Sequence, residues 1–375
     1  MLRLLLIIPT LDRSGAEKQF CLLAEGLSKQ GIEVEVVALT RGGPVEAHLT
    51  AANVPYSILG KRNRFDLTAL RKLRKLIIER EPDVLLSCLF AGNSYARLAT
   101  IGMGSRRPKI LISERCVDSW KSSWQHWLDR RLRSRTDLLI ANSQSVSDFY
   151  STGGFPKDRI RVIPNGVISP SQPELTKAEF CEEIGIPAES KLIAFVGRLA
   201  PQKRLKDLLW AMQMLRHSRP DAYFLLIGEG PQRSELEYFA QDADAASHSR
   251  FLGHRDDAAS LLHLIDVFWL ASEFEGMSNS LMEAMACGKP VVVSDISPNR
   301  ELVEHGKEGW IANLGDPAGF TQYTLKLLED PETAQKIGAA GQQKMESEFS
   351  IKQMIDRFHS LIAEVCPESS AGNAR

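Results

Sequence analysis

Residues 267–294 read VFWLASEFEGMSNSLMEAMACGKPVVVS and contain a strand, a helix and a second strand in that order. The apolar runs Val267–Ala271 and Pro290–Ser294 predict buried strands, because short runs rich in β-branched and aromatic residues are typical of them. Between them, Ser280–Cys287 has the length and composition of a helix. This succession predicts a βαβ unit with two parallel strands.

The same alternation runs through both halves of the chain. Further strands are predicted at Leu4–Ile8, Glu33–Leu39, Val84–Cys88, Lys109–Ser113, Leu138–Ala141, Arg161–Ile163, Leu192–Val196, Tyr223–Ile227 and Arg250–Leu252. Segments with the apolar periodicity of helices separate most of these strands. The predicted fold class is therefore α/β, with two Rossmann-like doubly wound domains facing across a cleft.

The domain boundaries follow from a change in composition. Residues 166–190 hold three prolines among polar residues around one short helix, which is typical of a linker. We therefore expect an N-terminal domain over residues 1–168, a linker over 169–190 and a second domain over 191–348. Residues 349–375 would form a C-terminal helix that crosses back to the first domain, followed by a tail.

Composition and charge limit the function classes. The whole chain carries 46 Lys and Arg against 47 Asp and Glu, but residues 1–170 hold 26 against 16 and the remainder holds 20 against 31. A basic half is suited to an anionic surface or a phosphate-bearing substrate. The six scattered cysteines form no CxxC pair, and no stretch approaches a membrane span, so we expect a cytoplasmic protein without disulfides, metal or nucleic-acid partner.

The strongest functional pattern is the turn that precedes the predicted helix of the opening segment. The backbone N–H groups of Asn279, Ser280 and Leu281 would lie at a helix N-terminus, which attracts phosphate. Glu283, one turn inside, can bind a ribose diol, as an acidic residue does in dinucleotide folds. The alternative is that Glu275 and Glu283 are ordinary acids favoured at a helix start.

A second pattern follows the strand that ends at Val196. Gly197 ends this strand, and Arg198 and Lys203 come directly afterwards, where the pair could bind a diphosphate. Each cation alone could equally form a surface salt bridge. The turn after the first strand, Asp12–Glu17, contains Gly15, which would let backbone approach a ligand closely.

In order, the motifs resemble those of glycosyltransferase family 4. They comprise Ser14–Glu17 (SGAE), Asn142–Ser143, Pro164–Val167 (PNGV), Gly197–Arg198 with Lys203, Gly228–Pro231 (GEGP), Phe251–Gly253 (FLG), and Glu275 and Glu283 separated by seven residues. The resemblance covers nearly the whole chain. It implies the GT-B fold, retaining transfer from a nucleotide sugar (UDP- or GDP-linked) to a glycan or lipid-linked acceptor in surface polysaccharide or glycolipid synthesis, and no required metal or cofactor.

The resemblance also assigns roles to residues. Arg198 and Lys203 would neutralise the donor diphosphate, Glu275 would bind a hydroxyl of the transferred sugar, and Glu283 would bind the ribose. The remaining donor-binding residues would be Gly15, Gly197, Gly228, Leu252, Met277, Ser278, Asn279, Ser280 and Leu281. On the acceptor side we expect Ser14, Glu114 and Arg115. Alternatively, Glu114 is a helix-capping glutamate and Arg115 is a surface arginine.

Three positions depart from the family pattern. Ser14 replaces a glycine of the first turn, Arg204 stands where a glycine often follows the lysine, and Cys88 stands where many members carry a histidine. Two other functions stay open. A sugar-nucleotide epimerase can share this architecture, although no clear acid/base pair is found for the reacting carbon, and the altered glycine and missing histidine are compatible with a non-catalytic nucleotide-sugar binder.

Basic and aromatic residues of the first half suggest contact with an anionic membrane. Residues 66–80 place four cations on one helical face, and Trp120, Trp124 and Trp127 precede an arginine-rich stretch. The alternative is a solvated helix face and a tryptophan-lined acceptor groove. Peripheral contact with the inner face of the cytoplasmic membrane is thus a hypothesis.

Overall fold

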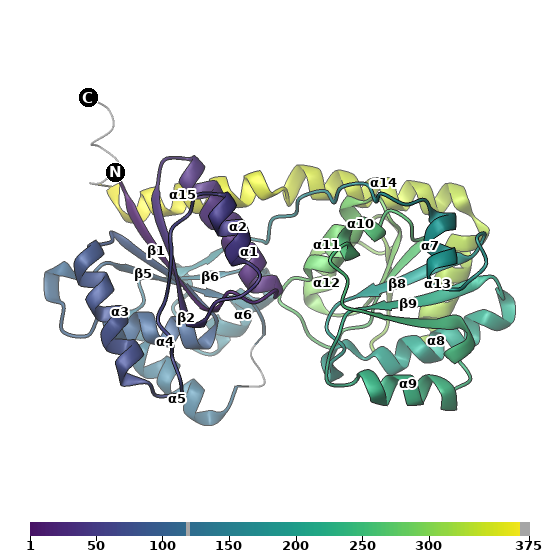
Figure 1. Cartoon of the computed structure of the whole chain (residues 1–375), viewed down its shortest axis with the longest axis horizontal. Coiled ribbons are helices and arrows are strands. Elements are labelled where there is room, and N and C mark those ends of the chain that lie inside the picture. The colour runs from purple at the N-terminus through teal and green to yellow at the C-terminus, as the bar shows by residue number, and fades with distance from the viewer. Residues whose placement is uncertain (118–120, 368–375) are drawn as a thin grey trace. The chain divides into compact units, whose positions relative to one another are not determined.

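The computed structural model describes residues 1–117 and 121–367, which form two compact units (Figure 1). The first unit contains Met1–Gly166 together with the C-terminal helix α15 (Ile351–Val365), and the second contains Val167–Ser350. Trp120 and the tail from residue 368 lie outside the described residues. In the described ranges, no helix is both long enough and apolar enough to span a membrane.

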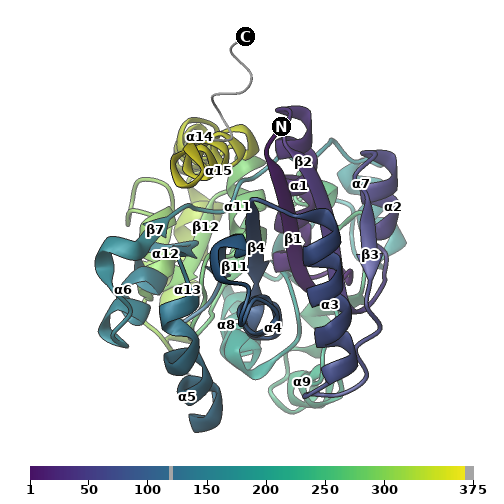
Figure 2. The ribbon, with the colours of Figure 1, turned by 90° about the vertical axis from the view of Figure 1, so that its left-hand side faces the viewer.

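The first unit is built on a seven-stranded parallel sheet in the order β3-β2-β1-β4-β5-β6-β7. Figure 2 labels its edge strands β3 and β7 and, between them, β2, β1 and β4. Its strands are β1 (Arg3–Thr10), β2 (Glu33–Arg41), β3 (Tyr56–Ile58), β4 (Val84–Cys88), β5 (Lys109–Glu114), β6 (Leu138–Ala141) and β7 (Ile160–Val162). Its other helices are α1 (Gly15–Lys29), α2 (Glu46–Ala51), α3 (Leu67–Arg80), α4 (Leu89–Ala99), α5 (Ser123–Leu132) and α6 (Gln144–Thr152).

Both faces of this sheet are buried, which explains why its strands are continuous apolar runs. Within β1, Leu4, Leu6 and Ile8 belong to one core cluster, whereas Leu5 and Ile7 belong to the other. Successive side chains of a strand point to opposite faces, so this run fills both cores. Helices α1 and α15 cover one face, and α3 and α4 cover the other (Figure 1).

The second unit is built on a six-stranded parallel sheet in the order β10-β9-β8-β11-β12-β13. Its strands are β8 (Lys191–Val196), β9 (Ala222–Ile227), β10 (Ser249–Gly253), β11 (Val267–Leu270), β12 (Val291–Ser294) and β13 (Trp310–Ala312). Its helices are α7 (Lys177–Glu183), α8 (Leu205–Ser218), α9 (Arg233–Asp242), α10 (Ala258–Leu261), α11 (Asn279–Ala286), α12 (Ser297–Leu302), α13 (Pro317–Glu329) and α14 (Pro331–Glu348).

The helix α7 lies inside the segment expected to be a linker. Its residues Phe180 and Cys181 are fully buried and belong to the core of the second unit. The helix begins with a capping box at its N-cap, Thr176. The Thr176 hydroxyl and backbone N–H both donate to the Glu179 carboxylate. Residues 167–190 are therefore part of the second unit in this structure.

Candidate active site

The predicted donor-binding residues lie at the carboxyl ends of four neighbouring strands of the second unit. Gly197 follows β8, Gly228 follows β9, Leu252 lies near the end of β10, and Glu275 follows β11. Because β10, β9, β8 and β11 are adjacent and parallel, these ends meet at one edge of the sheet. Ligands of open α/β sheets bind at this edge.

Glycines allow the strand ends to pack closely. The N–H of Gly197 donates to Ile227 O at 2.9 Å, and the N–H of Gly228 donates to Gly253 O at 2.7 Å. Gly228 has a φ of +138°, and a Cβ atom there would lie 2.0 Å from the carbonyl oxygen of Gly197. Only glycine fits at residue 228 without moving this part of the edge.

Lys203 and Glu275 form an ion pair that joins the turn after β8 to the turn after β11. The Ser272 hydroxyl donates to the same carboxylate oxygen at 2.7 Å, and Glu273 N donates to Gln202 O at 2.8 Å. The two side chains of the pair are only 14% and 11% exposed. The lysine predicted to bind phosphate and the glutamate predicted to bind sugar therefore contact each other.

Arg198 and Arg204, the two arginines of the same turn, differ in their hydrogen-bond and ion-pair partners. Arg198 is exposed, and its guanidinium has no hydrogen-bond or ion-pair partner among the described residues. Arg204 instead donates to Asp207 Oδ2 at 2.6 Å. Its φ of +49° is left-handed, a conformation that glycine adopts without strain, which accounts for the glycine expected there.

The helix α11 begins at the predicted phosphate-binding turn. Ser278 is its N-cap, and the Ser278 hydroxyl accepts a hydrogen bond from Leu281 N at 3.4 Å. Met277 and Ser278 are each 6% exposed, and Leu281, whose N–H was predicted to face phosphate, is fully buried. Asn279, Ser280 and Glu283 are half-buried.

The acceptor-side residues lie at the equivalent edge of the first unit. Ser14 is the N-cap of α1 and Gly15 its first residue, and both are exposed. Glu114 ends β5 and Arg115 follows it, so a single strand, β4, separates them from the end of β1. The sheet therefore places the two sets of residues on the same edge, one strand apart.

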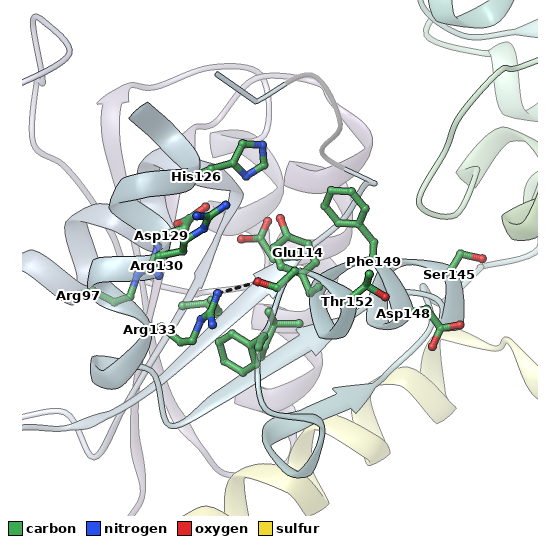
Figure 3. A pocket seen from close by; sticks show the side chains of 15 residues that line it. Arg97, Glu114, His126, Asp129, Arg130, Arg133, Ser145, Asp148, Phe149 and Thr152 are labelled. Carbon is green, nitrogen blue, oxygen red and sulfur yellow. Dashed lines mark hydrogen bonds and ion pairs between the residues drawn. The ribbon is translucent and has the colours of Figure 1, made fainter. Parts of the chain in front are cut away.

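A cavity of about 610 Å³ lies beside Glu114 in the first unit. Figure 3 shows His126, Asp129 and Arg130 of α5 on one side and Ser145, Asp148, Phe149 and Thr152 of α6 on the other. The remaining lining residues are Arg97, Ile112, Arg133, Leu139, Tyr150, Gly153 and Phe155. Sequence reasoning missed this cavity because its lining comes from five separate segments.

Buried charges form one wall of this cavity. Arg97, only 1% exposed, donates to Asp129 Oδ1 at 2.6 Å, and Lys121 Nζ lies 3.1 Å from Asp129 Oδ2. Lys121 Nζ also lies 3.7 Å from Glu114 Oε1, which accepts a hydrogen bond from Asn93 Nδ2 at 3.0 Å. Glu114 is thus 2% exposed and held by its neighbours.

Two further polar residues lie close to Arg115. The Arg115 guanidinium donates to Asn165 Oδ1 and lies over the ring of Phe20, 5.8 Å from its centroid. Burial lowers the pKa of Arg115 to about 10.

Burial also raises the pKa of Glu17, which was part of the first-turn motif but not of the predicted site. Cys88, at the position where a histidine was expected, is fully buried.

No group of three or more His, Cys, Asp or Glu side chains suited to a metal ion occurs within residues 1–117 and 121–367.

Two family models match successive parts of the chain. The model described as Glycosyltransferase Family 4 matches residues 13–169, and the model described as Glycosyl transferases group 1 matches residues 176–344. The chain is a family 4 type glycosyltransferase.

Two curated relatives align with this glycosyltransferase over almost their whole length. It is 23% identical to the lipopolysaccharide core biosynthesis glycosyltransferase LpsE of Rhizobium meliloti, covering 93% of this chain and 96% of the relative. It is 26% identical to the N-acetyl-alpha-D-glucosaminyl L-malate synthase of Bacillus anthracis, covering 93% and 94%.

Solved structures show that the glycosyltransferase has the GT-B fold, with two Rossmann-like domains. The structure of Anabaena Alr3699/HepE in complex with UDP-glucose superposes with a TM-score of 0.86 at 20% identity, covering 97% of this chain and 100% of that one. The expected fold class is thereby confirmed.

Proposed function

We propose that this glycosyltransferase binds a UDP- or GDP-linked sugar at the strand edge of its second unit and transfers the sugar with retention of configuration. The observation that carries this proposal is Arg198, an exposed guanidinium without a partner among the described residues, on the edge that also holds the start of α11. An unpaired guanidinium and a helix N-terminus both favour a diphosphate. The Anabaena protein that shares the fold was solved with UDP-glucose, which supports a nucleotide-sugar donor.

The proposed mechanism is front-face substitution. Arg198 stabilises the charge that develops on the leaving diphosphate, and this diphosphate helps to deprotonate the acceptor hydroxyl. The bond from the anomeric carbon to the phosphate oxygen breaks, and the bond to the acceptor oxygen forms on the same face. Electrostatic stabilisation and positioning then supply the rate enhancement, with no carboxylate nucleophile and no metal requirement.

The acceptor is proposed to be a glycan or a lipid-linked sugar in surface polysaccharide or glycolipid synthesis. The names of two relatives refer to lipopolysaccharide core biosynthesis, and that of another refers to a diphosphoundecaprenol-linked sugar. The cavity beside Glu114 combines the aromatic residues Phe149, Tyr150 and Phe155 with arginines and carboxylates. Such a lining suits the apolar and hydroxyl faces of a sugar.

Peripheral contact with an anionic membrane is a further part of this proposal. A groove of about 310 Å³ near α3 and α5 is lined by Lys61, Arg64, Phe65 and Trp124, and the Arg64 guanidinium lies over the Trp124 ring at 4.7 Å. Phe65 is 69% exposed. Sedimentation with anionic vesicles at low and high salt tests the contact: salt-sensitive binding supports it, and absence of binding at both salts refutes it.

The decisive experiment incubates the protein with UDP- and GDP-linked sugars, first alone and then with an acceptor panel, with and without EDTA. We expect donors with one of the two nucleotide bases to raise the melting temperature of the protein. Without acceptor, the donor should be hydrolysed slowly, and with acceptor the product should keep the anomeric configuration of the donor. An epimerised donor would instead identify an epimerase. Binding without any turnover would identify a non-catalytic binder, and activity lost in EDTA would refute metal independence.

A further inference from the structure

Glu17 is a buried carboxylate with one oxygen left without a partner. Glu17 lies in the first turn of α1 and is 4% exposed. The Thr10 hydroxyl donates to Oε1 at 3.1 Å, and the carboxylate also accepts a hydrogen bond from its own backbone N–H. Oε2 has no hydrogen-bond partner in the described chain.

Leaving a buried carboxylate oxygen without a donor costs free energy, and native structures therefore seldom retain one without a reason. A capping role at α1 requires only the oxygen that is already used. Packing would be better served by a neutral side chain of the same size. Oε2 is thus the part of Glu17 that the folded unit does not explain.

Other polar residues lie on the same edge of the sheet as Glu17. It lies at the carboxyl end of β1, on the edge that also carries Arg115 and Asn142, and the Arg115 guanidinium attracts its charge. Asn142 is 2% exposed, and its Oδ1 is a second buried oxygen without a partner among the described residues. The Asn142 amide group donates to the backbone oxygen of Arg115 at 3.4 Å, so Arg115 is a neighbour of both residues.

We propose that Glu17 is an acceptor-binding residue whose Oε2 accepts a hydrogen bond from a sugar hydroxyl of the acceptor. This inference rests on the proposed function, because the donor residues belong to the second unit and this edge belongs to the acceptor-side unit. A hydroxyl supplies the single donor that Oε2 lacks and brings no charge beside Arg115.

The variant Glu17→Gln tests the assignment because it keeps the shape and replaces the free acceptor oxygen by an NH₂ group. The exposed Glu33 of β2 provides the matched control Glu33→Gln. Release of nucleoside diphosphate is measured from the nucleotide sugar that the wild type hydrolyses fastest. Each protein is assayed with water alone and with a panel of hexoses, disaccharides and octyl glycosides as probe acceptors.

We expect Glu17→Gln to lower kcat/KM for the best probe acceptor at least tenfold while hydrolysis with water alone and donor KM stay within twofold. Its melting temperature at pH 8 should equal or exceed that of the wild type, because burial raises the pKa of Glu17 and the neutral amide removes a buried charge. Glu33→Gln should leave every value unchanged. A purely structural role would instead lower the melting temperature and reduce both reactions together.

Unchanged acceptor kinetics in Glu17→Gln would overturn the inference, as would a wild type that hydrolyses a donor but is accelerated by no sugar in the panel. A wild type that neither binds nor hydrolyses any nucleotide sugar would overturn the proposed function itself. The two failures are therefore distinguishable.

Discussion

The two cations of the turn after β8 should respond differently to the same substitution. Arg198 is exposed and has no partner in the described ranges, so Arg198→Ala should change the free energy of unfolding by no more than about 0.5 kcal/mol. Lys203 is 14% exposed and paired with the 11% exposed Glu275. Its removal leaves a buried carboxylate without its cation, which costs on the order of 3–5 kcal/mol.

The expected activities follow from the proposed role of Arg198. If its guanidinium stabilises the leaving diphosphate, Arg198→Ala should lower kcat by about a hundredfold, which corresponds to about 2.7 kcal/mol of transition-state stabilisation. Lys203→Ala should lose activity and stability together. The double variant Lys203→Met/Glu275→Gln should recover part of the lost stability, because it leaves no unpaired charge.

Both quantities can be measured on the same preparations. Urea unfolding is followed by intrinsic tryptophan fluorescence, which covers both units because Trp124 and Trp127 lie in the first and the fully buried Trp269 lies in the second. Turnover is measured with the nucleotide sugar that most raises the melting temperature. Wild-type turnover in folded Arg198→Ala would refute the diphosphate contact, and an unchanged urea midpoint in Lys203→Ala would refute the energetic importance of the buried pair.

Three further predictions concern stability and are checked by the same urea unfolding. Arg204→Gly should be more stable than Arg204→Ala by about 1 kcal/mol, because both lose the ion pair but only glycine relieves the positive φ; equal midpoints would contradict this. Gly228→Ala should cost at least ~2 kcal/mol more than Gly185→Ala, since both have positive φ but only residue 228 faces a backbone oxygen; similar costs would show that the strand ends can separate. Lys121→Met should cost about 3–5 kcal/mol, because it removes the buried cation that lies beside both Glu114 and Asp129, whereas Lys29→Met, at a side chain that is 71% exposed, should cost under about 1 kcal/mol; a Lys121→Met midpoint that moves no further than that of Lys29→Met would argue against the ion network.

Much of the fold could be predicted because its strands are buried on both faces and are therefore continuous apolar runs. The strands β3 and β13 were not predicted, since each has only three residues and lies at the edge of its sheet. A run this short is a weak signal: β7, also a three-residue edge strand (Ile160–Val162), was predicted one residue out of place, at Arg161–Ile163. The segment around α7 was read as a linker from its prolines, although Phe180 packs into the second core.

The candidate site was predictable as far as single turns were concerned, but not in how the turns interact. Lys203 and Glu275 are 72 residues apart in the chain, and each was assigned a separate ligand group. Their contact follows from the adjacency of β8 and β11, which only the strand order reveals. Glu17 belonged to the first-turn motif, but the free oxygen that sets it apart depends on Thr10 and on burial.

The ion pair and the predicted roles of its members are compatible if a donor replaces both halves of the pair. A phosphate group can take the place of the Glu275 carboxylate beside Lys203, and a sugar hydroxyl can take the place of the ammonium beside Glu275. A nucleoside diphosphate without the sugar would satisfy Lys203 but leave the carboxylate with only the Ser272 hydroxyl, which already donates to it at 2.7 Å. The pair would therefore favour ligands that carry both groups, and it would keep two otherwise costly buried charges neutralised until such a ligand arrives.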